Sequence, residues 1–354
     1  MTARFFAAVC AVLISFSIIS CGGSEDAPKS ATEGFVTIVY SGNVGAETEP
    51  CGCRIPEGGF ARRATVLDSL RGVYDNLLVL DSGGMLYPWN YIYPPHDVTS
   101  PVVADLIVDL LDELKFDAIN VSSFDLALGP DSLLAYSTTM NTKWLSSNIV
   151  WEKSGERIFT PDVTYDVNGL KVSVFGLIDQ LSRGMIILGD NSPAEVTDPF
   201  AAAREEVEKF KSSDVVIGLF NMDLDRVKEL VVEVPGIDLV IMGHTLEHKD
   251  SNDILPPMKV GNTVIARCAD GGRVIGKITL IVKNGGTDFI DATQRLTLQP
   301  GIEKDTDLKL EQSSYVNAFY TLDPKIPSVE SIKERVEKVE RWKDAYLDSV
   351  RTAN

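Results

Sequence analysis

Residues 35–62 read FVTIVYSGNVGAETEPCGCRIPEGGFAR, and this stretch organises the rest of the chain. Its first six residues are apolar or β-branched and predict a buried strand. Small and turn residues follow as far as the Glu-Pro-Cys-Gly-Cys motif at 49–53, and an apolar series at helical spacing begins at Phe60. The long loop therefore lies at the carboxyl end of a strand, where open α/β sheets bind their ligands.

The same alternation of strand and helix patterns continues along the chain. Further strands are predicted at residues 77–81, 117–121, 170–178, 214–220, 238–242, 262–267 and 274–282. Helices are predicted from Phe60, from Ser100 as N-cap with Pro101 in the first turn, around Leu133, and over 201–211 and 224–232. This pattern indicates an α/β domain over residues 34–298, built on one large mixed sheet or a pair of sheets.

Residues 299–354 differ in composition from the domain before them. They are expected to form a polar connector and then an amphipathic C-terminal helix from about Val329. We favour a helix that packs back on the domain over a helix that pairs with a coiled-coil partner.

The N-terminal 20 residues carry one charge, Arg4, and an apolar run at 5–19 that is too short for a spanning helix. This pattern predicts an export signal, and residues 18–21, IISC, resemble the bacterial lipobox, which implies lipidation of Cys21. Residues 21–33 would then be a flexible tether. The expected location is the bacterial cell envelope, lipid-anchored and facing the periplasm or exterior. The alternative is an uncleaved membrane anchor.

Charge and cysteine content restrict the partners. The chain has 33 basic and 51 acidic side chains, a net charge of −18, which disfavours nucleic acid. Contact with the membrane is expected only through the lipid on Cys21, and the candidate partners are an envelope redox protein or a small anionic ligand. Of five cysteines, three lie beyond Cys21, an odd number for an oxidising compartment.

Six short motifs follow one another in a fixed order. They are GGFAR at 58–62, DSGG at 81–84, NVSSFD at 120–125, SN at 147–148, DLVIMGHT at 238–245 and GGRVIG at 271–276. In this order they resemble the metallophosphoesterase domain of the bacterial 5′-nucleotidase family, from about Phe35 to Val282. The resemblance implies a calcineurin-like, four-layer αββα sandwich in which two mixed sheets are flanked by helices.

The same resemblance implies a two-metal site for phosphoester hydrolysis, yet most of its ligands are replaced here. Asn43 and Gly45 stand where the family has Asp and His, and Gly84 stands where it has a bridging Asp. Other replaced positions are Val121, Ser122, Leu246 and a position near Phe220 or Asn221. Of the Gly-His-x-His motif only His244 remains, and the whole chain has three histidines. The usual two-metal centre is therefore not expected.

The three remaining thiols suggest a different site. In this fold, the loops after the first strand, after Met242 and after Arg267 are expected to meet at one rim. Cys51, Cys53, Cys268 and His244 would then form a candidate site for one zinc or another thiophilic metal. The alternative is a short Cys51–Cys53 disulfide with Cys268 as a buried small hydrophobe. Both alternatives stay open at the level of sequence.

Two function classes follow from these residues. The first is an exported lipoprotein that acts as a metal- or redox-linked binding protein through Cys51, Cys53 and Cys268. The second is a divergent metal-dependent hydrolase of phosphoester bonds, with candidate catalytic residues Asp81, His244, Asn43 and Asp125. The aromatic loop at 87–96, with Trp89, Tyr91 and Tyr93, is a candidate lid or partner-binding loop in either class, unless it packs on its own domain.

Overall fold

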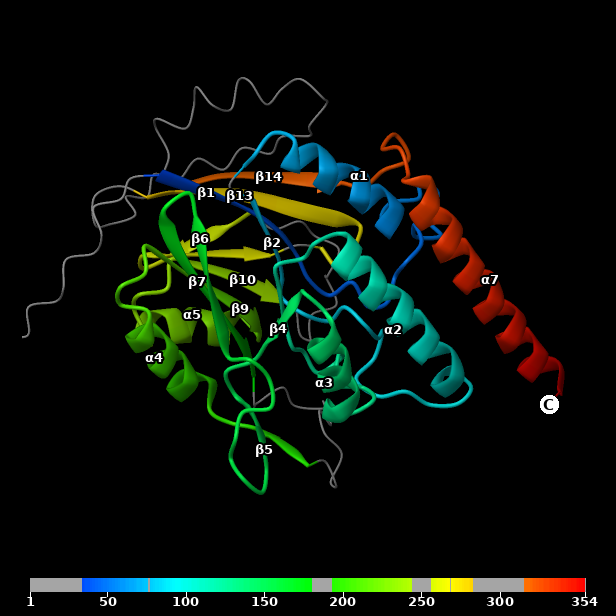
Figure 1. Cartoon of the computed structure of the whole chain (residues 1–354), viewed down its shortest axis with the longest axis horizontal. Helices are drawn as coiled ribbons and strands as arrows, with labels where there is room; N and C mark the ends of the chain where they lie inside the picture. The colour runs from blue at the N-terminus through cyan, green and yellow to red at the C-terminus, as the bar shows by residue number, and fades with distance from the viewer. Residues whose placement is uncertain are drawn as a thin grey trace, which may run out of the picture.

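The computed structural model describes residues 34–75, 77–179, 193–243, 256–267, 269–282 and 315–353, and it contains two stacked six-stranded sheets (Figure 1). The first sheet has the order β14-β13-β1-β2-β3-β4, with β1 (Gly34–Ser41), β2 (Leu77–Asp81), β3 (Ala118–Asn120), β4 (Lys143–Leu145), β13 (Val274–Val282) and β14 (Tyr315–Thr321). The second has the order β11-β12-β10-β9-β7-β6, with β6 (Asp162–Val167), β7 (Leu170–Ile178), β9 (Val215–Asn221), β10 (Leu239–Gly243), β11 (Met258–Val260) and β12 (Thr263–Arg267). A small two-stranded sheet pairs β5 (Ile149–Trp151) with β8 (Ala194–Val196).

Both sheets are mixed. The strands β1 to β4 are parallel, as are β7, β9, β10 and β12, whereas β13 pairs antiparallel with β1. Strands β6 and β11 are antiparallel edges of the second sheet. The carboxyl ends of the parallel strands therefore lie at one edge of each sheet, which is where loops with chemical roles collect.

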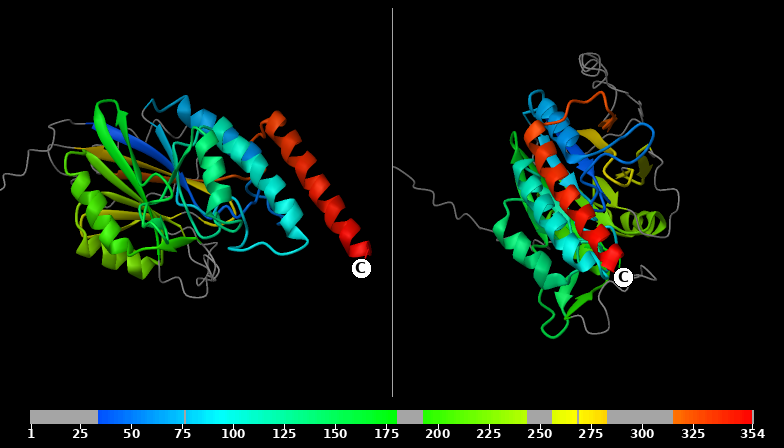
Figure 2. Two further views of the ribbon diagram at one scale, coloured as in Figure 1. Left: turned by 60° about the horizontal axis from the view of Figure 1, so that its bottom comes forward. Right: turned by 90° about the vertical axis from the view of Figure 1, so that its right-hand side faces the viewer.

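Helices cover the outer face of each sheet (Figure 2). The first sheet packs against α1 (Phe60–Arg71), α2 (His96–Glu113), α3 (Pro130–Thr139) and α7 (Glu330–Ala353). The second sheet packs against α4 (Pro199–Lys209) and α5 (Leu224–Glu233). The four-layer αββα arrangement predicted from the sequence is confirmed.

Strand β1 contributes side chains to the hydrophobic clusters on both faces of the first sheet. Val36, Ile38 and Tyr40 point into the apolar cluster between the sheets, because successive side chains of a strand face opposite sides. Val39 points the other way, into the cluster beneath the helices. Both faces of the strand are buried, which explains why its sequence is a continuous apolar run rather than an alternating one.

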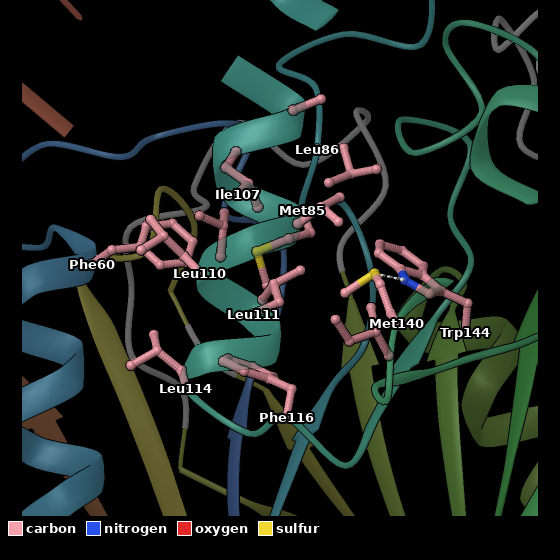
Figure 3. Packing of buried hydrophobic residues seen from close by; sticks show 14 of the residues in the cluster. Phe60, Met85, Leu86, Ile107, Leu110, Leu111, Leu114, Phe116, Met140 and Trp144 are labelled. Atoms are coloured by element: carbon pink, nitrogen blue, oxygen red, sulfur yellow. Dashed lines mark hydrogen bonds between the residues drawn. The ribbon is translucent and has the colours of Figure 1, made fainter. Parts of the chain in front are cut away.

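Helix α2 supplies the centre of the cluster beneath the helices (Figure 3). Its fully buried residues Ile107, Leu110 and Leu111 pack with Phe60 of α1 and Met85 of the loop after β2. The apolar residues of α2 recur at helical spacing on one face, and this face packs against the loop that follows β2.

The start of α2 differs from the prediction. The helix begins at His96, and Pro101 lies inside it rather than in its first turn. The Ser-Pro pair at 100–101 is typical of a helix start, but the chain already turns earlier, where the amide of His96 donates to the carbonyl of Tyr93 at 2.9 Å. The imidazole of His96 also contacts the ring of Tyr93, so this first turn includes an aromatic contact.

The sequence pattern missed one strand within the predicted connector. This strand, β14, pairs antiparallel with β13 from Tyr315 opposite Leu280 to Thr321 opposite Val274 and forms an edge of the first sheet. The predicted C-terminal helix is confirmed as α7, and it packs back on the domain through Ile332 and Val336. Within the described part of the chain, no helix combines the length and apolar character needed to cross a bilayer.

Candidate functional site

The loops at the carboxyl ends of several strands meet at one place. The amide of Asn43, after β1, donates to the carbonyl of Gly83, after β2, at 2.7 Å. The carbonyl of Asn43 accepts from the amide of Gly271 at 2.8 Å, and its side-chain amide donates to Asp270 at 3.1 Å. The loops after β1, β2 and β12 are thus joined through one residue, as expected for a ligand-binding edge.

Asp81 ends β2 and is fully buried. Its carboxylate accepts a hydrogen bond from the Ser41 hydroxyl at 2.5 Å and another from the Gly83 amide at 2.7 Å. The Ser41 hydroxyl in turn accepts from the guanidinium of Arg63 at 2.9 Å. Asp81 therefore ties β2 to the end of β1 and to α1. Sequence reasoning missed Ser41 and Arg63, although Arg63 directly follows the GGFAR motif.

Burial raises the pKa of Asp81 to about 7, against the lowering effects of Ser41, Arg63 and Gly83. Because the folded protein holds this proton more tightly than the unfolded chain, its contribution to stability is complete below the unfolded pKa of 3.8. That contribution is lost as the pH rises through about 7.

We expect the replacement Asp81→Asn to remove this pH dependence. Between pH 4 and pH 7 the free energy of unfolding of the wild type should fall by roughly 4 kcal/mol more than that of the variant. Urea unfolding of both proteins across this range measures the difference. Parallel curves for the two proteins would contradict the raised pKa of Asp81.

Asp125 is also fully buried, and it organises the loop after β2. One carboxylate oxygen accepts from the amides of Met85 at 2.8 Å and Leu86 at 3.0 Å. The other accepts from the amide of Gly84 at 2.8 Å and from the amide and hydroxyl of Ser122 at 3.1 and 2.7 Å. Burial raises the pKa of Asp125, and these hydrogen bonds oppose that rise. Five protein donors occupy the oxygens that a cation would need.

Amide side chains join the carboxyl ends of the two sheets. Asn120, at the end of β3, donates to the carbonyl of Leu177 in β7 at 2.9 Å. Asn148 donates to the carbonyl of Ile178 at 2.8 Å and accepts from its amide at 3.0 Å. Two buried amide atoms, Oδ1 of Asn120 and Nδ2 of Asn221, have no hydrogen-bond partner among the described residues. Within the described residues, one buried acceptor and one buried donor at this edge are therefore unsatisfied.

Gly84, which the sequence resemblance places where the family has a bridging Asp, lies in a closely packed turn. Gly84 has a φ of +77°, and a Cβ built on it would lie 2.8 Å from Oδ1 and 3.1 Å from Cα of Asn43. A carboxylate placed there would require both a left-handed backbone and a shift of the loop after β1. The glycine is therefore part of how the two loops pack.

The structure joins Cys51 and Cys53 by a disulfide, with their Cα atoms 5.3 Å apart. Cys51 is half-buried and Cys53 is exposed. Within the described ranges, no three His, Cys, Asp or Glu side chains are grouped so that they could hold a metal ion. His244 and Cys268 lie outside the described residues, so the four-ligand thiolate site stays a prediction, and metal binding by Cys51 and Cys53 would require reduction of their disulfide.

The aromatic loop lies at the surface, as a lid or partner-binding loop requires. Trp89, Tyr91 and Tyr93 are 38%, 60% and 42% exposed, whereas Tyr87 is buried. The rings of Trp89, Tyr93 and His96 contact one another, with centroids 5.5 to 5.6 Å apart. The loop is thus a compact aromatic cluster, and its role stays a prediction.

No family model matches the chain, but comparison with known proteins gives distant relatives that include 5′-nucleotidases and a nucleotide phosphoesterase. A 5′-nucleotidase of Vibrio parahaemolyticus is 22% identical over 265 residues, which cover 66% of this chain and 46% of that protein. The trifunctional nucleotide phosphoesterase YfkN of Bacillus subtilis is 27% identical over 212 residues, covering 52% of this chain and 14% of that protein. The chain thus spans about half the length of the 5′-nucleotidase and a smaller part of YfkN.

Solved structures agree with this result at the level of the fold. The 5′-nucleotidase precursor of Thermus thermophilus superposes with a TM-score of 0.67 at 18% identity, covering 88% of this chain and 59% of that one. The calcineurin-like phosphoesterase YfkN of Bacillus subtilis superposes with a TM-score of 0.64 at 16% identity, covering 90% and 100%. Together with the two mixed sheets, these similarities show that the chain has the fold of the 5′-nucleotidases and calcineurin-like phosphoesterases, and that 5′-nucleotidases are among its distant relatives.

Proposed function

We propose that this chain is a binding protein of the bacterial cell envelope, one that keeps the phosphoesterase fold without the two-metal reaction. One observation carries this proposal: the buried carboxylates Asp81 and Asp125 accept hydrogen bonds from protein donors rather than facing an open site. Two-metal hydrolysis needs carboxylate and imidazole ligands directed at two cations. Here the corresponding junction is held by amide hydrogen bonds from Asn120 and Asn148.

Thiol chemistry belongs to the same proposal. The Cys51–Cys53 disulfide lies on the long loop after β1, and Cys268 is the third cysteine of the proposed exported chain. In their reduced form, these thiols are the residues that would hold one thiophilic metal. Anchoring through a lipid on Cys21 is suggested by the IISC motif at 18–21. Loss of the protein from the membrane fraction in Cys21→Ala tests that anchor, and full retention would contradict it.

A second candidate is a divergent metal-dependent phosphoester hydrolase. The names of the relatives favour it, as does His244, which directly follows Gly243 at the end of β10. Such an enzyme would have to rebuild a metal site from Asn43, Asp81, Asp125 and His244. The saturated carboxylate of Asp125 argues against this, because a cation would have to displace its donors.

Hydrolysis of a generic aryl phosphate with added Mn²⁺ or Zn²⁺ separates the two candidates. We expect the wild type to show no turnover above that of a sample without protein. The variant His244→Ala is the informative one, and His248→Ala is its matched control because it removes another imidazole outside the motif. Turnover that is lost in His244→Ala and kept in His248→Ala would establish the hydrolase and overturn the proposal.

A further inference from the structure

The segment from Pro50 to Gly58 forms a loop whose two ends, here called its base, are held together by backbone pairing. The amide of Cys51 donates to the carbonyl of Glu57 at 2.8 Å, and Pro50 and Gly58 form an antiparallel bridge. The guanidinium of Arg62 donates to the carbonyl of Pro56 at 2.6 Å and to that of Leu322 at 3.2 Å. The base is thus tied to α1 and to the residue after β14, so reduction of the disulfide would leave the two cysteines within reach of each other.

The two sulfur atoms of this loop have different surroundings. Cys53 and its neighbours Arg54 and Ile55 are exposed, and Ile55 is 56% exposed. Cys51 is half-buried at the base, where the backbone amide of Glu57 donates a hydrogen bond to its sulfur at 3.4 Å. A hydrogen bond to a thiolate lowers the pKa of the thiol, and a thiol of lower pKa leaves faster in disulfide exchange. The exposure of Cys53 therefore favours nucleophilic attack at its sulfur, and the hydrogen bond from the Glu57 amide favours Cys51 as the leaving group.

We propose that Cys51–Cys53 is an exchange-active disulfide, which the thiolate of a protein dithiol attacks at Cys53 with Cys51 as the leaving group. This inference rests on the thiol-linked role proposed above, and it adds the direction of the reaction and the chemical class of the partner. The exposed Arg54 attracts an incoming thiolate, and the exposed Ile55 offers apolar contact beside the attacked sulfur.

The electrons and protons of the exchange balance with a dithiol as the reductant. The first partner thiolate forms a bond to Sγ of Cys53, and the bond between the two cysteines breaks to leave Cys51 as a thiolate. The second partner thiolate then attacks its own mixed-disulfide sulfur and releases Cys53. The partner is oxidised to a disulfide by two electrons, and the pair Cys51 and Cys53 is reduced and takes up two protons.

Reduced glutathione is the probe that tests the direction of attack. The oxidised full chain is treated with it, quenched with acid early in the reaction, and capped with iodoacetamide after the glutathione is removed. Fragmentation of the peptide ending at Arg54 then locates each group by mass. We expect glutathione on Cys53 and the cap on Cys51. Glutathione mainly on Cys51, or divided equally, would overturn the inference while leaving a thiol-linked function in place.

A pair of variants tests the role of the amide. Glu57→Pro removes the N–H that reaches Cys51, whereas Glu57→Ala changes the side chain and keeps that N–H. We expect glutathione to open the disulfide roughly three- to tenfold more slowly in the proline variant than in the alanine variant. Equal rates in two folded variants would contradict the role of Cys51 as a stabilised leaving group. If the proline variant does not fold, the mass mapping decides.

Failure of the proposed thiol-linked function can be distinguished from failure of the proposed direction of attack. A disulfide that excess glutathione does not open, in a protein that hydrolyses aryl phosphate through His244, would remove both the thiol-linked function and this inference. A disulfide that opens at Cys53, in a protein without hydrolytic turnover, supports both.

Discussion

Replacing Asp125 by alanine should lower the free energy of unfolding by about 4 kcal/mol, because it removes the shared acceptor of a buried loop. Three consecutive amides, from Gly84 to Leu86, would lose their partner, together with the amide and hydroxyl of Ser122. All of these donors are buried with Asp125. Buried donors without an acceptor cost more than the hydrogen bonds themselves contribute. Urea unfolding measures the loss.

The variant Asp125→Asn is the matched control for this effect. It keeps one carbonyl oxygen in nearly the same place, so part of the donor set retains an acceptor. We expect a loss of free energy clearly smaller than that of Asp125→Ala. If alanine cost less than about 1 kcal/mol, Asp125 would not be the organiser of the loop, and its carboxylate would again be a candidate metal ligand.

The second large effect is expected at Gly83, on the same loop. Its φ is +95°, and a Cβ built on it would lie 2.6 Å from the backbone oxygen of Asn120 and 2.9 Å from Cβ of Ser122. The replacement Gly83→Ala would force alanine into the left-handed backbone region. It would also bring the new Cβ too close to the carbonyl oxygen of Asn120, which cannot rotate away. We expect a loss of about 3 kcal/mol in the free energy of unfolding.

The variant Gly169→Ala separates the two causes. Gly169 has a φ of +85°, but a Cβ built on it would meet nothing within 4 Å. Its replacement should cost only about 1 to 2 kcal/mol, the strain of the backbone alone. If both replacements lowered the free energy of unfolding equally, the backbone around Gly83 and Asn120 would be able to shift and accommodate the added Cβ. The loop after β2 would then be less tightly packed than its contacts indicate.

The junction between the two sheets is held in place by hydrogen bonds and close backbone packing. Asp125 and Gly83 fix the loop after β2, while Asn120 and Asn148 tie the first sheet to β7. Hydrogen bonds between described residues therefore supply the connections at this junction.

The strands and helices were predictable because they depend on local periodicity. The continuous apolar run at 35–40 predicts a strand buried on both faces, and β1 has apolar residues in the clusters on both its sides. The four layers were implied by the family resemblance that the order of the six motifs carries. Two boundaries failed for reasons of packing, since His96 begins α2 ahead of the Ser-Pro pair and β14 is an edge strand within the expected connector.

The roles of the polar residues could not be predicted in the same way. Asp81 and Asp125 were candidates because they lie in the motifs DSGG and NVSSFD, which resemble those of the 5′-nucleotidase family, and only the fold shows that Ser41, Ser122 and the backbone amides engage them. Sequence spacing permits Cys51 and Cys53 to form either a disulfide or part of a metal site. Periodicity carries information about which face of an element is buried, whereas the partner of a polar atom depends on loops far apart in the chain. Tertiary structure alone decides that partner.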